Sequence, residues 1–184
     1  NVAAHSFKVT QAAQMLGDIE EQAGHAVDWR SLYEKALNHD YTERFIGDIK
    51  TPVKYATNEL RTMLAKVDES LTENFIQTEI PVEFRAAYER RFAEGKDDTL
   101  EGKILSVADK IDLMYESFGE IQKGNPEPVY MDIYRSSLKA IMKFNDMASV
   151  QYFLKMILPE LLKDNANTNA QNHLAIMTTQ IIQQ

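Results

Sequence analysis

The chain contains no cysteine, which excludes disulfide bonds and thiolate metal ligands. No apolar run approaches the roughly 20 residues that cross a bilayer, and no segment resembles the apolar region of a signal peptide. We therefore expect a cytoplasmic protein without a membrane partner. Any metal ion must be held by histidine, aspartate or glutamate.

Positive charge is also scarce. The 20 lysines and arginines are outnumbered by 28 acidic residues, which gives a net charge of −8. Phosphate neutralisation dominates binding to nucleic-acid polymers, so an acidic chain without a basic stripe argues against such a partner. A small phosphate ester is still a feasible substrate, because one metal ion and one or two basic groups are enough to bind it.

The apolar residues recur with helical spacing almost throughout, which predicts an all-α protein. We expect one domain over residues 1–163, followed by an Asn-rich linker and a helical tail over 164–184. The tail would dock either on the body or on a partner. Trp29 is expected to pack near the start of the second helix, and Gly17 is expected to end the first. The predicted helices span 2–16, 31–46, 53–74, 100–121, 129–145 and 149–163.

Polar residues interrupt the apolar face of three of these helices. His5 lies three and four positions from apolar neighbours on the first helix. His39 and Asp40 take apolar positions on the second, and Asp109 lies in the middle of the apolar stripe of 100–121. Burying a carboxylate without a partner is costly, so we expect these side chains to satisfy one another by meeting.

Two imidazole nitrogens and two carboxylate oxygens suit a divalent ion with positions left open for water or substrate. Adjacent helical residues point about 100° apart, so the ion would lie between helices, at the edge of the helix that carries His39 and Asp40. The alternative is that the four are unrelated polar residues, such as a hydrogen-bonded core histidine or a capping aspartate. The interruption of three separate stripes favours a shared site.

Three short segments resemble a known signature. "NVAAHS", "NHDYTE" and "VADKID" are similar to the H…HD…D pattern of the HD-domain metal-dependent phosphohydrolases. Within that superfamily, "HDYTERFIGDIKTPVKY" resembles the matching segment of the bacterial YfbR-type 5′-deoxynucleotidases. The resemblance covers about residues 1–121. It implies an all-α HD-domain-like helical bundle, often a homodimer, that removes phosphate from nucleoside 5′-monophosphates.

The resemblance also implies roles for individual residues. Glu43 aligns with the catalytic glutamate, and Asp48 with an acidic residue near the sugar and the attacking water. Thr51 and Lys54 fall in a Thr-Pro-x-Lys stretch that is expected to contact the substrate. The residues that would bind a transition metal such as cobalt, manganese or zinc are His5, His39, Asp40 and Asp109.

Two other functions stay open at this point. One is an HD phosphohydrolase that acts on a cyclic dinucleotide, a nucleoside triphosphate or a guanosine alarmone. The other is a non-catalytic HD-like protein whose metal serves assembly. Glu43 and Asp48 favour an enzyme, because a structural metal site would not need them.

Overall fold

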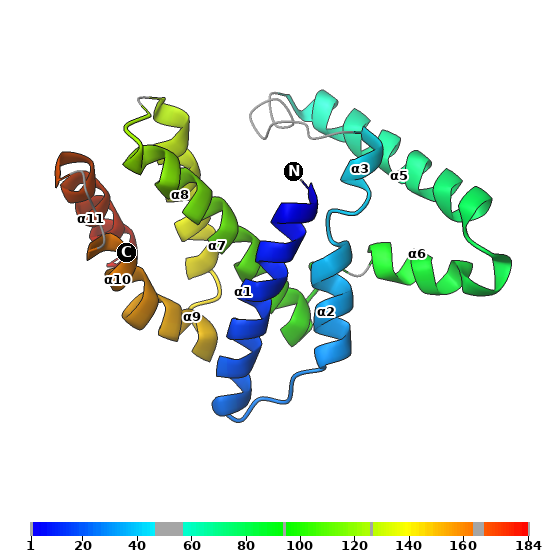
Figure 1. The fold of residues 1–184 in the computed structure, drawn as a ribbon, viewed down its shortest axis with the longest axis horizontal. Helices are drawn as coiled ribbons and strands as arrows, with labels where there is room; N and C mark the ends of the chain where they lie inside the picture. Colours follow the sequence, from blue (N-terminus) through cyan, green and yellow to red (C-terminus); the bar gives the residue numbers. More distant parts are fainter. Residues whose placement is uncertain (1, 47–56, 94, 126, 164–167, 184) are drawn as a thin grey trace.

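The computed structural model describes residues 2–46, 57–93, 95–125, 127–163 and 168–183 (Figure 1). Every regular element in these ranges is helical, which confirms the all-α prediction. The elements are, in chain order, α1 (Val2–Gln22), α2 (Trp29–Asn38), α3 (Glu43–Ile46), α5 (Asn58–Glu79), the 3₁₀ turn η1 (Val82–Phe84), α6 (Arg85–Ala93), α7 (Leu100–Gln122), α8 (Pro128–Met142), α9 (Ala148–Tyr152), the π-helical turn η2 (Phe153–Ile157), α10 (Leu158–Lys163) and α11 (Thr168–Ile182).

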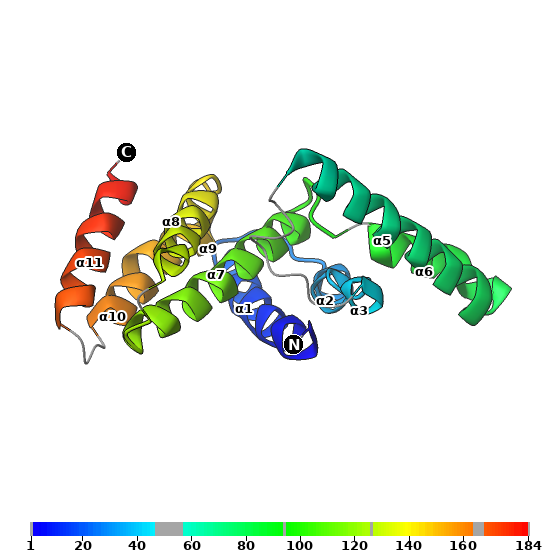
Figure 2. The same ribbon diagram turned by 90° about the horizontal axis from the view of Figure 1, so that it is seen from above.

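Helix α7 forms the centre of the body and packs against α1, α2 and α8 (Figure 2). Its apolar residues recur every three or four positions, so one broad face is buried, including Ile104, Val107 and Met114. Thr99 caps its first turn by accepting a hydrogen bond from the Gly102 N–H (3.1 Å). The predicted helix over 100–121 is confirmed, and it extends by one residue.

Gly17 does not end the first helix as expected, because α1 continues to Gln22. The ring of Trp29 lies against this position, and a Cβ atom there would be 2.8 Å from Trp29 Cη2 and 3.2 Å from Leu32 Cδ2. Gly17 is therefore a contact point between α1 and α2 rather than a helix stop. Trp29 packs at the first position of α2, as predicted, and its indole N–H donates to Glu21 (2.8 Å).

The second helix is shorter than predicted and ends at Asn38. Two side chains hydrogen-bond to carbonyls of its last turn: Asn38 Nδ2 donates to Glu34 O (2.6 Å), and His39 Nδ1 donates to Ala36 O (2.8 Å). In a longer helix, Ala36 O would instead accept from the backbone N–H of Asp40. Residues 39–42 form turns before the short helix α3 begins at Glu43. His39 and Asp40 consequently lie in a turn, where the 100° separation of helical neighbours does not apply.

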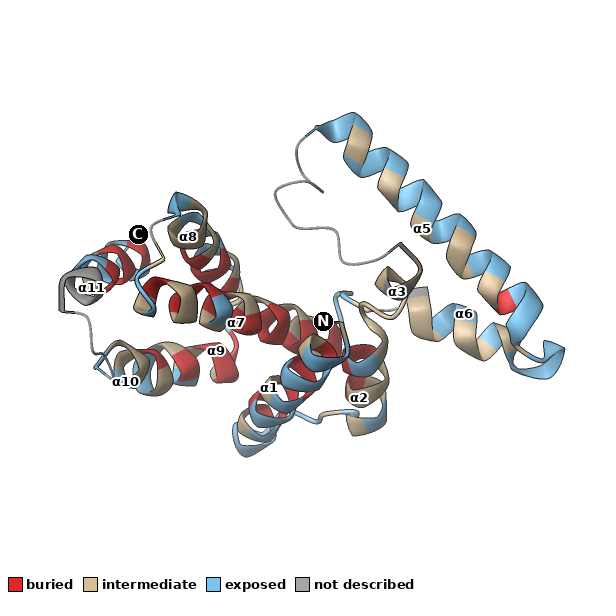
Figure 3. Ribbon diagram, turned by 45° about the horizontal axis from the view of Figure 1, so that its top comes forward, coloured by how far each residue is buried: buried red, intermediate tan, exposed pale blue. Residues whose placement is uncertain are grey.

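Helices α5 and α6 form an arm that projects from the body (Figure 3). Ile76 is the one buried residue that we find in α5. An aromatic cluster joins the arm to the body: Tyr41 stacks on Phe92 with ring centroids 5.0 Å apart, and Phe45 lies 5.1 Å from Phe75. The predicted helix over 53–74 begins outside the described residues, and α5 continues to Glu79, just before Pro81.

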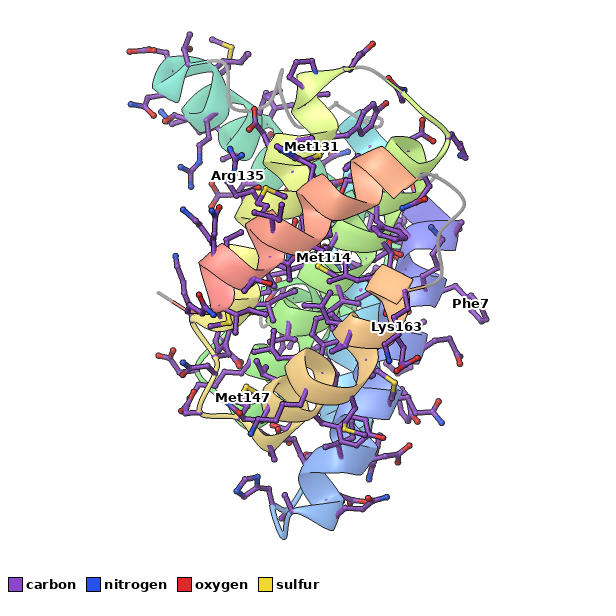
Figure 4. The ribbon with its side chains drawn as sticks, turned by 90° about the vertical axis from the view of Figure 1, so that its left-hand side faces the viewer. Phe7, Met114, Met131, Arg135, Met147 and Lys163 are labelled. Carbon is purple, nitrogen blue, oxygen red and sulfur yellow. The ribbon has the colours of Figure 1, made fainter. Side chains whose placement is uncertain are left out.

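The last helix packs on the body. Leu174 of α11 is fully buried, and Thr178 shares a hydrogen bond of 2.8 Å with the Tyr134 hydroxyl of α8. Figure 4 views this end with α11 in front, and it shows Phe7 of α1 pointing away from the body at one edge. Ile176 of the same helix is 59% exposed. In the described part of the chain, no helix combines the length and apolar character needed to span a membrane.

Candidate functional site

The structure brings together the four residues that the sequence singled out as metal ligands. His5 comes from α1, His39 and Asp40 from the turn after α2, and Asp109 from the middle of α7. His5 Nε2 lies 3.2 Å from Asp40 Oδ2 and 3.3 Å from Asp109 Oδ1. His39 Nε2 lies 3.3 Å from both His5 Nε2 and Asp40 Oδ2.

The hydrogen bonds of the two imidazoles direct both Nε2 atoms into this cluster. His39 Nδ1 donates to the Ala36 carbonyl (2.8 Å), and a carbonyl oxygen can only accept. His5 Nδ1 lies 2.7 Å from Asp112 Oδ2 of α7. Each Nδ1 is therefore engaged by an acceptor outside the cluster. In the neutral rings, both Nε2 atoms then present lone pairs to the same small space.

This donor set fits a divalent cation. Ligand atoms bound about 2.1 Å from one ion, at angles of about 90–110°, lie roughly 3.0–3.4 Å from one another. The contacts around His5 Nε2, at 3.2 and 3.3 Å, fall in that range. Among the described residues, the group whose ligating atoms all lie within 4.8 Å of one another comprises His5, His39 and Asp109, with Asp40 next to both imidazoles.

The electrostatics of the cluster favour a positive charge. Hydrogen bonds to Asp109 and Asp112, and then to Asp40, raise the pKa of His5 to about 11 although burial opposes this. Burial alone would raise the pKa of Asp40 and Asp109, but the histidines outweigh it and hold both pKa values below the usual range, with help from Lys96 at Asp109. A proton on His5 and a metal cation therefore satisfy the same carboxylates.

Lysines occupy the outer oxygen of Asp109. Lys96 Nζ lies 2.7 Å from Asp109 Oδ2, and Lys110 Nζ lies 3.2 Å from the same atom. The segment that carries Lys96 is anchored to α2 by an ion pair between Asp97 and the buried Lys35. The two lysines leave Asp109 Oδ1 as the oxygen that faces the histidines.

Sequence reasoning missed Asp112, Lys96 and Lys110. A signal for Asp112 was available, since it lies three residues after Asp109 and shares its face of α7. The contact of Lys96 with Asp109 depends on how the segment between α6 and α7 folds, which no spacing in the sequence indicates.

The expected catalytic and substrate-binding residues are placed only in part. Glu43 begins α3, and its backbone N–H donates to Asp40 O (3.1 Å), so the glutamate is coupled directly to the ligand turn. Asp48, Thr51 and Lys54 lie outside the described residues.

The all-α body gathers between its helices the two histidines and two aspartates of the segments that resembled the HD-domain signature. The chain is similar to the crystal structure of an HD-domain phosphohydrolase from Listeria innocua, with a TM-score of 0.89 and 57% identity, over 100% of this chain and 86% of that one. The model of the 5′-deoxynucleotidase YfbR-like family matches residues 1–161, and the chain belongs to this family.

Two relatives of the chain are named 5′-deoxynucleotidases. A 5′-deoxynucleotidase from Shewanella oneidensis is 29% identical over 160 residues, which are 86% of this chain and 80% of that protein. A 5′-deoxynucleotidase from Pasteurella multocida is 27% identical over 165 residues, or 89% of this chain and 82% of the relative. The resemblance read from the sequence is confirmed, and the HD-domain phosphohydrolase fold implies a divalent metal.

Proposed function

We propose that this enzyme removes phosphate from deoxynucleoside 5′-monophosphates with the help of a divalent transition metal held by His5, His39, Asp40 and Asp109. The observation that carries the proposal is the convergence on His5 Nε2 of an imidazole and two carboxylates, all within 3.3 Å. The family membership of the chain and the names of its relatives support the choice of substrate.

The chemistry requires water to attack phosphorus while the bond from phosphorus to the 5′ oxygen breaks. When bound, a divalent ion would supply Lewis acidity, which makes water nucleophilic near neutral pH and polarises a phosphate oxygen. Glu43, coupled to the ligand turn, would take the proton from the attacking water and pass it to the leaving 5′ oxygen. The products are then a nucleoside and inorganic phosphate.

The remaining roles complete this mechanism. We propose that Asp48 orients the water or a sugar hydroxyl, and that Thr51 and Lys54 contact the phosphate. Lys54 would add positive charge for the phosphate. Cobalt, manganese and zinc are the metals we expect at this site, and a nucleotide substrate fits a cytoplasmic location.

Phosphate release tests the proposal. Purified protein is assayed on nucleoside monophosphates, triphosphates, cyclic dinucleotides and guanosine alarmones, with manganese, cobalt or zinc. Release from deoxynucleoside 5′-monophosphates supports the proposal. Turnover of only another class of nucleotide would assign the enzyme a different substrate within the superfamily. Absence of turnover on all of these nucleotides would favour a non-catalytic role.

Two substitutions separate metal binding from turnover. Glu43→Ala is expected to retain bound metal and lose turnover by about 10²–10⁴-fold, the usual contribution of general acid–base catalysis. Asp109→Ala is expected to lose both metal and turnover. Glu69→Ala and Asp98→Ala, at exposed positions, are the matched controls. Full activity of Glu43→Ala would contradict the assignment of that residue.

We also propose that two copies associate, as the family resemblance implies. Helix α5 presents Met63 and Val67, which are 62% and 42% exposed, on a face that the described body does not cover. Helices gain most of their stability from packing, so a second copy against α5 would stabilise the arm. Light scattering would give the mass in solution, and a monomer at micromolar concentration would refute association.

A further inference from the structure

Asp112 contacts His5 on the side of the imidazole ring that faces away from the other metal-ligand candidates. Its Oδ2 lies 2.7 Å from His5 Nδ1, the ring nitrogen that faces away from the cluster. Asp112 is 4% exposed and follows Asp109 by three residues on α7. One face of α7 therefore presents two successive carboxylates to the two nitrogens of the same imidazole: Asp109 to Nε2 and Asp112 to Nδ1.

This contact determines what His5 can offer to a cation. Carboxylate oxygens accept hydrogen bonds, so the proton of the neutral His5 ring resides on Nδ1 and Nε2 keeps its lone pair. Without an acceptor at Nδ1, the ring could place its proton on Nε2 or rotate, and either change removes a ligand. The bond to an anion also makes the imidazole a stronger donor to a metal.

Asp112 is itself held in place. Lys8 of α1 lies with its Nζ 3.6 Å from Asp112 Oδ1 and 2.7 Å from Glu116 Oε1. The carboxylate thus has one oxygen on His5 and the other toward a lysine from the same helix as His5. These contacts fix the position of Asp112 between α1 and α7.

We propose that Asp112 is the positioning residue of the metal centre, which acts through His5 by fixing its tautomer and ring orientation. The proposal rests on the metal site proposed above. A purely structural Asp112 would instead tie α1 to α7 through Lys8, and Glu116 provides the comparison. Glu116 binds the same lysine but lies one turn further along α7, and we find no contact of it with His5 among the described residues.

The test is the metal affinity of the purified full chain, measured by titrating metal-free protein with zinc in competition with a chromophoric chelator. Asp112→Ala is expected to bind zinc about 10–100-fold more weakly than wild type. Asp112→Asn, which keeps an acceptor oxygen but loses the charge, should fall between the two. Glu116→Gln should match wild type. Circular dichroism confirms that each variant is folded before titration.

A second readout reports the ring directly. In zinc-loaded protein, the nitrogen-15 spectrum of the four histidines should show a His5 Nδ1–H signal protected from exchange, and Asp112→Ala should lose this protection. If Asp112→Ala does not fold, the zinc titration and the nitrogen-15 spectrum are both recorded on Asp112→Asn instead.

The outcomes distinguish this inference from the proposed function. Zinc affinity within twofold of wild type in a folded Asp112→Ala would overturn the positioning role, and so would an equal loss in Glu116→Gln. If wild type binds zinc but releases no phosphate with any metal, the proposed function fails. The zinc affinities of the Asp112 variants still test the positioning role of Asp112 in that case. If wild type binds no zinc, manganese or cobalt, both proposals are overturned.

Discussion

The contact between Gly17 and Trp29 sets the approach of α1 to α2, the helices that lead to His5 and His39. Adding one methyl group by Gly17→Ala tests it. The new Cβ would lie 2.8 Å and 3.0 Å from two atoms of the Trp29 ring, distances at which the ring must move. The expected change in stability is a balance of two opposing effects.

Alanine is favoured over glycine inside a helix by about 1 kcal/mol. Overpacking a filled contact costs about 1–3 kcal/mol of stability. A cost near the middle of that range, about 2 kcal/mol, exceeds the gain of about 1 kcal/mol from helix propensity. Gly17→Ala should therefore lower the free energy of unfolding by about 1 kcal/mol, and Tm by about 2–4 °C in a chain of this size.

Urea denaturation followed by fluorescence measures this change, since Trp29 is the single tryptophan of the chain and lies at the contact. Gly119→Ala is the matched control, because a Cβ at that position of α7 would meet no atom within 4 Å apart from its chain neighbours and the backbone of its own helix, and it should stabilise the protein by about 1 kcal/mol. Trp29→Phe removes part of the obstructing ring, so in that background Gly17→Ala should change from destabilising to stabilising, measured by circular dichroism. A stabilising Gly17→Ala in the wild-type background would refute the reasoning.

Three further predictions concern acid stability, the last helix and the metal. Burial alone would raise the pKa of Glu20, but Ser149 and His25 outweigh it and lower the pKa. This carboxylate should thus stabilise the fold above its unfolded pKa of about 4.3 and lose that effect as pH falls through the lower folded value. Acid titrations should show Glu20→Gln less stable than wild type by about 1–3 kcal/mol at pH 7, with the difference shrinking below pH 4; a constant difference would contradict the shift. Leu174→Ala, at a fully buried position of α11, should cost about 2–5 kcal/mol in urea denaturation, against less than about 0.5 kcal/mol for the exposed Ile176→Ala, and equal costs would show that α11 does not pack as described. Chelation of the metal should lower Tm, since a ligand at 100 times its Kd stabilises by about 2.7 kcal/mol, and a thermal scan unchanged by chelator would argue against a bound ion.

The sequence supported the family assignment and the candidate ligands because both depend on residue types at fixed spacing. Helical periodicity predicted α7 almost to the residue, since thirteen of its residues are buried and the apolar stripe is long. The same periodicity was wrong at the end of α2, where the Asn38 and His39 side chains compete with the backbone for carbonyl oxygens. Competition of this kind leaves no mark on an apolar pattern.

By itself, the sequence determined the helical class through its apolar spacing and the family through its motifs. It also determined four metal-ligand candidates, because burying His and Asp on apolar faces is costly unless these side chains meet. Only the tertiary structure decided how they meet. The turn after α2 places His39 and Asp40 beside His5, and the packing of α1 on α7 places Asp112 behind the same ring. These contacts join residues up to 107 positions apart, and their distances depend on how the helices pack rather than on any local spacing.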